Sequence, residues 1–258
     1  MLTHLPDDLL NVLIISDIHD SISAIDSLAG KLQDTVIDFC ILCGDILDLD
    51  HNINIDLLPE YDARLSQFLS AISSMTSSVV YVLGNHDPIL HSRLPASENI
   101  LRQCVHKKRV ELLPGLSFVG VGGSVPSYVG NSLFYDGHPY TDESAFASDL
   151  SDALRLVSGD DQFILVTHSG PEGSTTLDVN ESNIIQMGSK SLSDVVIQYN
   201  KSMLANVHGH SHGCRGLRTV GECSVINPGA LKDGNASIMK LERNDRWSVV
   251  DVEFFKVF

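Results

Sequence analysis

Five short clusters of aspartate, asparagine and histidine are spread along this chain. Each follows a short apolar run, and together they are Asp17-Ile18-His19, Gly44-Asp45, Gly84-Asn85-His86-Asp87, Thr167-His168 and Gly209-His210-Ser211-His212. Imidazole nitrogens and carboxylate or amide oxygens are ligands of Mn, Fe and Zn ions, whereas Cu(I) and iron–sulfur centres need thiolates, which these clusters lack. Two divalent ions about 3.5–4 Å apart supply the nucleophile and the charge neutralisation that phosphoester hydrolysis requires. The residue types are therefore those that a pair of divalent metal ions would use.

Taken one at a time, most of these clusters have an ordinary structural explanation. An Asp-x-His triplet or a Gly-Asp pair says little. Asn85, His86 and Asp87 in one turn could cap a helix, but a cap rarely needs all three residue types, so this cluster is a stronger signal. His210 and His212 are more informative, because alternation in an extended segment sends both imidazoles to the same side. The presence of all five clusters in one chain favours a shared metal site.

The elements that carry the first three clusters repeat one pattern. Strands expected over 12–16, 38–43 and 79–83 each end at a cluster, and helices expected over 20–33 and 61–75 separate them. Alternating strands and helices predict parallel strands. Because such sheets bind ligands beyond the carboxyl ends of their strands, we expect Asp17, Asp45 and Asn85 at one sheet edge, with Asp45 at its centre.

The second half of the chain predicts a mixed arrangement. Residues 124–140 are expected to form a long loop after a strand that ends at Gly122-Gly123, and these glycines lack the spacing of a dinucleotide-binding fingerprint. A helix over 142–157, a strand over 162–167, a helix over 192–199 and a strand over 204–207 follow. Two or three strands near 223–226, 235–241 and 246–256 have no helix between them, so we expect this part to be antiparallel. The fold class is α/β, with a mixed second half.

Composition narrows the class of protein. The chain has 258 residues, of which 43% are hydrophobic, and we expect one domain over residues 1–258. Its 17 basic and 33 acidic residues give a formal charge of −16, which repels nucleic acid and anionic membranes. Neither a signal peptide nor an apolar run of about 18 residues is present, so a soluble cytoplasmic protein is expected.

The cysteines favour a structural role. Five is an odd number in a chain without an export signal, which predicts reduced thiols and not a disulfide framework. Cys40 and Cys43 form a C-x-x-C, but they lie in an apolar strand and no second pair has similar spacing. We interpret them as buried structural residues, in preference to a zinc or redox site.

In their order, the five clusters resemble the motifs of the calcineurin-like metallophosphoesterases, which are Asp-x-His, Gly-Asp, Gly-Asn-His-Asp/Glu, His and Gly-His-x-His. The resemblance covers residues 12–229. It implies two divalent metal ions, Mn, Fe or Zn, in one centre. One ion would be held by Asp17, His19, Asp45 and His212. The other would be held by Asp45, as a bridge, and by Asn85, His168 and His210.

The resemblance also implies roles for two residues that are not ligands. His86 would stabilise the transition state or protonate the leaving oxygen, and Asp48 would orient His86. The implied fold is a four-layer αββα sandwich of two mixed β-sheets flanked by helices. The implied reaction is hydrolysis of a small phosphodiester or phosphomonoester by attack of a metal-bound hydroxide.

Two features separate the chain from the serine/threonine protein phosphatases of the family. Asp48 is followed by Leu49-Asp50 and not by the Arg-Gly of serine/threonine protein phosphatases, and Asp87 stands where those enzymes have Glu. These differences favour the smaller phosphodiesterase-like branch and a diester over a monoester. The alternatives are a nuclease of the same family, which the acidic charge disfavours, and a metal-binding scaffold without catalysis.

The loop expected over 124–140 is the candidate for substrate selection, because loops at the ends of strands carry such groups. Its candidate substrate-binding residues, with aromatic faces or polar tips suited to a base or sugar, are Tyr128, Asn131, Tyr135 and His138. The alternative is a surface excursion that covers the sheet edge. His208 lies beside the last cluster, where a structural or supporting role is favoured over that of a further ligand.

Overall fold

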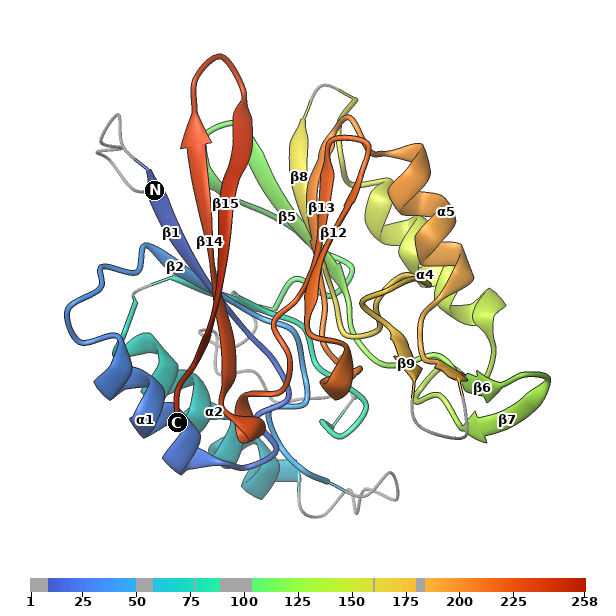
Figure 1. The fold of residues 1–258 in the computed structure, drawn as a ribbon, viewed down its shortest axis with the longest axis horizontal. Coiled ribbons are helices and arrows are strands. Elements are labelled where there is room, and N and C mark those ends of the chain that lie inside the picture. The colour runs from blue at the N-terminus through green and yellow to red at the C-terminus, as the bar shows by residue number, and fades with distance from the viewer. Residues whose placement is uncertain (1–8, 50–57, 77, 89–103, 160, 180–183) are drawn as a thin grey trace.

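The computed structural model describes residues 9–49, 58–76, 78–88, 104–159, 161–179 and 184–258, with two large β-sheets packed face to face and helices outside them (Figure 1). The first sheet has five strands in the order β15-β14-β1-β2-β3, and the second has six in the order β12-β13-β11-β8-β5-β4. The carboxyl ends of β1, β2, β3, β8 and β11 carry the five clusters. The fold therefore gathers these clusters at one end of the two sheets.

The first sheet begins with three parallel strands. These are β1 (Leu10–Ile15), β2 (Phe39–Leu42) and β3 (Val79–Tyr81), followed in the chain by α1 (Ile22–Lys31) after β1 and α2 (Leu58–Ser73) after β2. On the other side of β1, β14 (Asn235–Arg243) pairs antiparallel with β1, and β15 (Trp247–Lys256) pairs antiparallel with β14. The predictions of parallel strands at the start and antiparallel strands at the end are confirmed here.

The second sheet has a parallel centre and antiparallel edges. Its strands are β4 (Arg109–Leu113), β5 (Leu116–Val121), β8 (Gln162–Thr167), β11 (Met203–Val207), β12 (Gly216–Val220) and β13 (Cys223–Asn227). The expectation that 223–226 belongs to an antiparallel region is only partly right, because β13 pairs antiparallel with β12 but parallel with β11. β12 was not predicted; it reverses the chain direction, and this lets β13 return parallel to β11.

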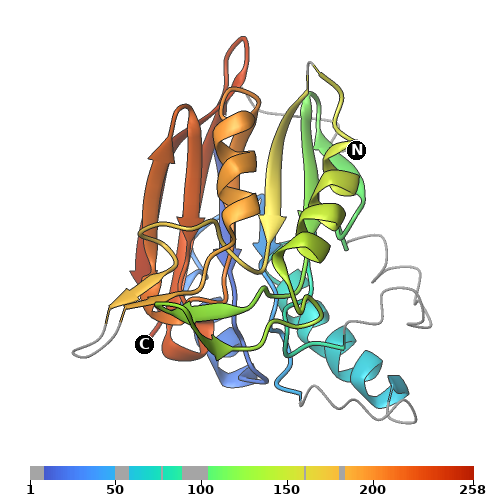
Figure 2. The same cartoon turned by 90° about the vertical axis from the view of Figure 1, so that its right-hand side faces the viewer.

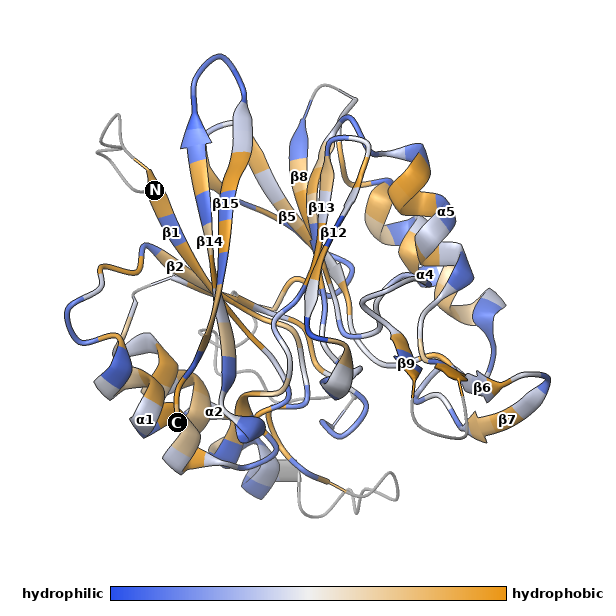
Figure 3. Ribbon diagram, viewed as in Figure 1, coloured by the Kyte–Doolittle hydropathy of each residue, from blue (hydrophilic) through white to orange (hydrophobic). Residues whose placement is uncertain are grey.

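Alternate side chains of each central strand enter different layers. In β1, Leu13 and Ile15 join the core beneath α1 and α2, whereas Val12 and Ile14 join the core between the two sheets. Residues of β8 likewise divide between the core between the sheets and the core beneath α4 (Glu143–Leu154) and α5 (Lys190–Gln198). Burial on both faces requires continuous apolar strands, which Figure 3 shows as long hydrophobic stretches. The predicted four-layer order of helix, sheet, sheet and helix is confirmed.

A third, smaller sheet was not predicted. It has the order β7-β6-β10-β9 and is antiparallel throughout, with β6 (Ser127–Val129), β7 (Ser132–Tyr135), β9 (Leu177–Val179) and β10 (Ile184–Gln186). Residues 124–140, expected as a loop, therefore contain a hairpin, and Figure 2 shows it below the helices that cover the second sheet. Strands of three or four residues are too short for periodicity to reveal. β6 also pairs with β10, a distant part of the chain, and this pairing extends the hairpin into a sheet of four strands.

The cysteines are all buried and free. Cys40 lies in β2 and Cys43 follows it, and burial raises the pKa of the Cys43 thiol. The prediction that both cysteines of this C-x-x-C are buried is confirmed, although Cys43 lies one residue beyond the end of the strand. Among the helices that the structure describes, none combines the length and hydrophobicity needed to span a membrane.

Candidate metal centre

Backbone hydrogen bonds tie the loops after β1 and β2 together. Asp17 N–H donates to the Gly44 carbonyl at 3.0 Å, and the N–H groups of Ile18 and His19 donate to the Asp45 carbonyl at 2.8 and 3.1 Å. Gly44 has φ of +94°, and a Cβ there would lie 2.6 Å from the Gly84 nitrogen, so only glycine fits. These contacts bring the carboxylates of two neighbouring strands to the same edge.

Left-handed backbone is uncommon for residues other than glycine. Within the described residues it occurs at Asp17, His19, Asp20, Asp45, Lys107 and His210. Four of these six are sequence-predicted metal ligands. Strained conformations of this kind concentrate at functional sites, where the surrounding structure holds them in place.

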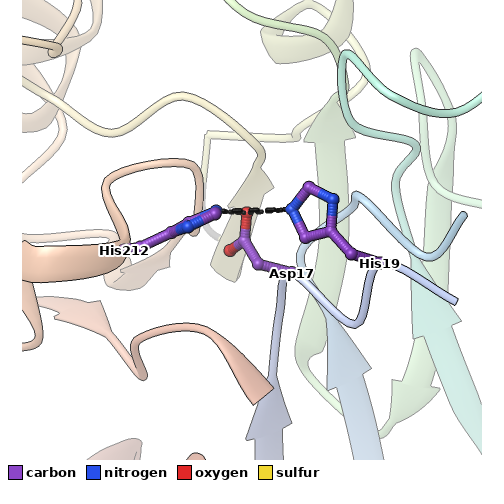
Figure 4. A group of neighbouring side chains, drawn as sticks. All are labelled: Asp17, His19 and His212. Atoms are coloured by element: carbon purple, nitrogen blue, oxygen red, sulfur yellow. Dashed lines mark hydrogen bonds and ion pairs between the residues drawn. The ribbon is translucent and has the colours of Figure 1, made fainter. Parts of the chain in front are cut away.

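A first cluster joins the loop after β1 to the loop after β11. Asp17 lies between the imidazoles of His19 and His212, as Figure 4 shows, with Oδ1 at 3.0 Å from His212 Nε2 and 3.9 Å from His19 Nε2. The two Nε2 atoms are 3.4 Å apart. Asp17 Oδ2 accepts a hydrogen bond from His210 N–H at 3.1 Å, which fixes the carboxylate. Three potential ligand atoms therefore converge on one point.

A second cluster contains Asp45, His168 and His210, all buried. His168 Nδ1–H donates to the Cys43 carbonyl at 2.7 Å, which leaves Nε2 facing Asp45 Oδ2 at 3.3 Å. Asn85 Oδ1 lies 2.9 Å from the same Nε2. The amide of Asn85 thus presents its oxygen to this cluster.

Asp45 lies between the two clusters. Its Oδ2 is 3.3 Å from His168 Nε2 and 3.7 Å from His19 Nε2. Its Oδ1 accepts a hydrogen bond from His86 N–H at 2.8 Å. One carboxylate therefore connects two separate groups of potential ligands.

The electrostatics of these clusters favour a cation. Burial by itself would raise the pKa of Asp17 and Asp45, but hydrogen bonds and the charges of neighbouring histidines hold both below the usual value. Burial lowers the pKa of His210 to about 3, and the charge of His168 adds to this effect. Burial would also lower the pKa of His168, but the attraction of Asp45 outweighs it and raises this pKa to about 9. The clusters therefore combine ionised carboxylates with a neutral imidazole at His210, and the same carboxylates stabilise a positive charge at His168.

One buried nitrogen of the donor set fits a metal ion. His210 Nε2 is buried and has no hydrogen-bond partner among the described residues, although the ring lies beside Asp45 and His168. Buried polar atoms are nearly always paired, since an unpaired one costs free energy. A metal ion at this nitrogen would satisfy it, and the two clusters fit a pair of ions that share Asp45.

Asp48 connects two histidines beside the clusters. Its Oδ1 lies 3.1 Å from His19 Nδ1 and 3.1 Å from His86 Nδ1. Burial tends to raise the pKa of Asp48, but the hydrogen bond from His19 and the charges of both histidines lower it. Asp48 therefore lies within hydrogen-bond distance of His86, the residue that it is predicted to orient.

Asp87, for which no separate role was predicted, fastens the loops after β2 and β3. Its carboxylate accepts hydrogen bonds from the N–H groups of Gly84 and Leu47, both at 2.8 Å, and of Ile46 at 3.2 Å. Burial and the charge of Asp45 raise the pKa of Asp87 to about 7. Its place in the fourth position of the Gly-Asn-His-Asp motif was the only signal of this supporting function.

His208 is also turned away from the clusters. It is buried, with Nε2 3.0 Å from Thr175 Oγ1 and Nδ1 3.1 Å from the Gly209 carbonyl oxygen. Burial lowers its pKa to about 4. These contacts favour the structural role over that of a further ligand.

Both clusters open into a cavity of about 460 Å³. Its lining comprises His19, Asp45, Asn85, His86, Phe134, Tyr135, Asp178, Ile185, Met187, His210, His212 and Gly213. Of the four substrate-binding candidates only Tyr135 is among them, and its hydroxyl accepts a hydrogen bond from Asn85 Nδ2 at 2.9 Å.

The other candidates lie elsewhere. Tyr128 is 44% exposed, Asn131 is in the exposed turn between β6 and β7, and His138 N–H bonds Ser124 Oγ at the base of the hairpin. Sequence reasoning missed Asp178, Ile185 and Met187. Nothing in the linear pattern connects these three residues to the hairpin or to the clusters.

The sequence pattern that describes the calcineurin-like phosphoesterases matches residues 10–214, and the chain belongs to this family of metal-dependent phosphoester hydrolases. An uncharacterized protein of Methanocaldococcus jannaschii is 26% identical over 213 residues, which are 80% of this chain and 87% of that protein.

Two solved structures share the fold. TT1561 of Thermus thermophilus has a TM-score of 0.65 and 19% identity over 97% of this chain and 100% of that one. A dimetal phosphatase from Danio rerio has a TM-score of 0.58 and 13% identity over 96% of this chain and 99% of that one. At these identities the similarity concerns the fold alone. The family predicted from the five clusters is confirmed.

Proposed function

We propose that this chain is a hydrolase of small phosphoesters that works with two divalent metal ions and prefers diesters to monoesters. The observation that carries the proposal is the sharing of Asp45. Its Oδ2 lies 3.7 Å from His19 Nε2 in one cluster and 3.3 Å from His168 Nε2 in the other, and both clusters open into one cavity.

The ligand assignment follows from the clusters. Asp17, His19 and His212 would hold one ion, Asn85, His168 and His210 the other, and Asp45 both. When bound, such ions neutralise charge on the phosphoryl oxygens and lower the pKa of a water that can then act as nucleophile. The protein's contribution is to keep the carboxylates ionised and the imidazole nitrogens directed inward, as the hydrogen bond from His168 Nδ1 to Cys43 does.

His86 is the group that would act on the substrate. It lines the cavity, and its Nδ1 lies 3.1 Å from Asp48 Oδ1. With Nδ1–H donating to Asp48, Nε2 is the nitrogen that can contact a phosphoryl or leaving oxygen. In its protonated form, His86 can donate a proton from Nε2 to the leaving group.

The cavity wall supports a diester over a monoester. No Lys or Arg is among the residues that line the described cavity. A phosphomonoester dianion would therefore depend on the metal ions alone for its charge, whereas a phosphodiester carries one negative charge.

The test compares hydrolysis of bis-p-nitrophenyl phosphate and p-nitrophenyl phosphate by the manganese-loaded protein. We expect activity that is lost on chelation, is restored by manganese and is higher for the diester. His86→Ala should retain its metal while kcat falls by about 10²- to 10⁴-fold, the scale of general acid catalysis. The loss should be smaller for p-nitrophenolate, which departs without a proton, than for an alkoxide leaving group.

Full activity of protein verified as metal-free would refute the proposal. Absence of any ester hydrolysis with two ions bound would instead favour the scaffold alternative. Loss of metal from His86→Ala would refute its assignment as a group that acts on the substrate.

A further inference from the structure

Part of the cavity wall is built by the small third sheet. Phe134 of β7 and Ile185 of β10 give it an apolar surface, and Met187 follows β10. Asp178 of β9 pairs with Ile185 across the sheet, so the two side chains lie on the same face. A carboxylate therefore stands beside apolar side chains in the wall of the same cavity that the candidate ligands line.

The carboxylate of Asp178 is available to bind a ligand in the cavity. Its carboxylate oxygens lie 3.8 Å from the point where a Cβ on Gly213 would be, so they are beside the loop that carries His212. Asp178 makes no hydrogen bond or ion pair with another described residue, although it is only partly exposed. Apart from the candidate ligands and His86, it is the one acidic or basic residue that lines the described cavity.

The negative charge of Asp178 favours some classes of substrate over others. A carboxylate attracts an ammonium group and accepts its hydrogen bonds, and it repels a second phosphate. With no Lys or Arg in the described lining, nothing offsets that repulsion for the outer phosphates of a nucleoside di- or triphosphate. Specificity of this kind combines an attraction with a repulsion.

We propose, on the basis of the proposed function, that Asp178 selects phosphodiesters in which one alcohol carries an ammonium group. The short carbon chain of such an amino alcohol lies against Ile185 and Met187, its ammonium group binds Asp178, and its phosphoryl group lies at the metal centre. Esters with a second phosphate in place of the ammonium group are excluded. Asp178 is thus a specificity-determining residue and takes no part in bond cleavage.

The experiment uses three p-nitrophenyl diesters that differ only in the second alcohol, which is 2-aminoethyl, ethyl or 2-phosphoethyl. For the manganese-loaded protein, kcat/KM should be at least tenfold higher for the aminoethyl ester than for the ethyl ester, and lowest for the phosphoethyl ester. Asp178→Asn should reduce the aminoethyl-to-ethyl ratio to less than threefold. Asp251→Asn, which removes the same charge from the exposed strand β15, should keep the wild-type ratio.

A second measurement does not depend on turnover. Binding of 2-aminoethylphosphonate and ethylphosphonate to the metal-loaded protein, followed by calorimetry, should show the same preference and the same loss in Asp178→Asn. A wild-type ratio near one, or a ratio that Asp178→Asn leaves unchanged, would overturn the role of Asp178. If no ester is hydrolysed but the ammonium preference in binding persists, the proposed function fails while the assignment of Asp178 stands.

Discussion

Tyr135→Phe tests how the small sheet supports the metal centre. The Tyr135 hydroxyl accepts a hydrogen bond from Asn85 Nδ2 at 2.9 Å, and the other end of that amide, Oδ1, lies 2.9 Å from His168 Nε2. The bond therefore holds the amide with its oxygen toward the cluster. Without the hydroxyl, the partly buried N–H loses its partner and the amide can rotate away from the orientation in which it would bind metal.

The expected size of the effect follows from this contact. Removing one partner from a buried neutral hydrogen bond costs about 1–3 kcal/mol, which corresponds to roughly 5- to 150-fold in an equilibrium constant. Loss of a group that orients a metal ligand weakens metal binding or activity by about 10- to 100-fold. We therefore expect Tyr135→Phe to weaken one of two metal equivalents by about 10- to 100-fold and to leave the other nearly unchanged.

The assay is a competition titration of manganese or zinc against a chelator of known affinity, with the metal content of each fraction measured. Tyr128→Phe is the matched control, because it removes the same atom from the same small sheet at a residue that does not line the cavity. Two ions bound with wild-type affinity in Tyr135→Phe would refute the positioning role. Equal weakening of both ions, or a similar effect of Tyr128→Phe, would point to a general loss of structure.

Two further predictions concern the bridge and the pH dependence of stability. Asp45→Asn should weaken the binding of both ions and lower the bound metal further than Asn85→Ala does. It should also reduce the rise in melting temperature on addition of manganese, because an ion at 100 times its Kd stabilises the folded state by about 2.7 kcal/mol and the variant binds the ion less tightly. Two ions per chain by elemental analysis in Asp45→Asn would contradict the bridge. Burial lowers the pKa of His106 to about 4, and its Nδ1 accepts a hydrogen bond from Gly122 N–H at 3.0 Å. As the pH falls below about 6.5 the unfolded chain binds a proton there and the folded protein does not, so this residue's contribution to stability is present above that pH and is lost toward pH 4. His106→Asn keeps an acceptor for Gly122 but has no imidazole to protonate. Between pH 7 and pH 5, the free energy of urea unfolding should therefore decrease by about 1–2 kcal/mol less in His106→Asn than in the wild type. Parallel pH profiles of the two proteins would show that His106 does not titrate in this way.

Much of the candidate site was readable because its residues follow strands. Asp17, Asp45 and Asn85 come directly after apolar runs, and parallel strands place their carboxyl ends at one edge whatever the rest of the chain does. The identities and order of the clusters also indicated the family. Periodicity was sufficient for the long central strands and for the helices, since each of these spans several repeats of its own pattern.

Short strands and their partners were not readable. β6 and β7 have three and four residues, and β9 and β10 have three each, which is at most two full periods of alternation. The choice of partner for β13 also depended on β12, which the sequence did not suggest. Pairings between distant strands depend on which surfaces the packed sheets leave available, and no local window contains that information.

The sequence by itself therefore determined which side chains could bind metal and on which strands they lie, because residue type and strand position are local properties. Only the tertiary structure decided that Asp45 stands between two clusters, that Tyr135 holds the amide of Asn85, and that Asp178 lines the same cavity. The physical reason is that these relations join segments far apart in the chain. Their distances are set by the packing of two sheets and by the register of the small third sheet, which no single segment encodes.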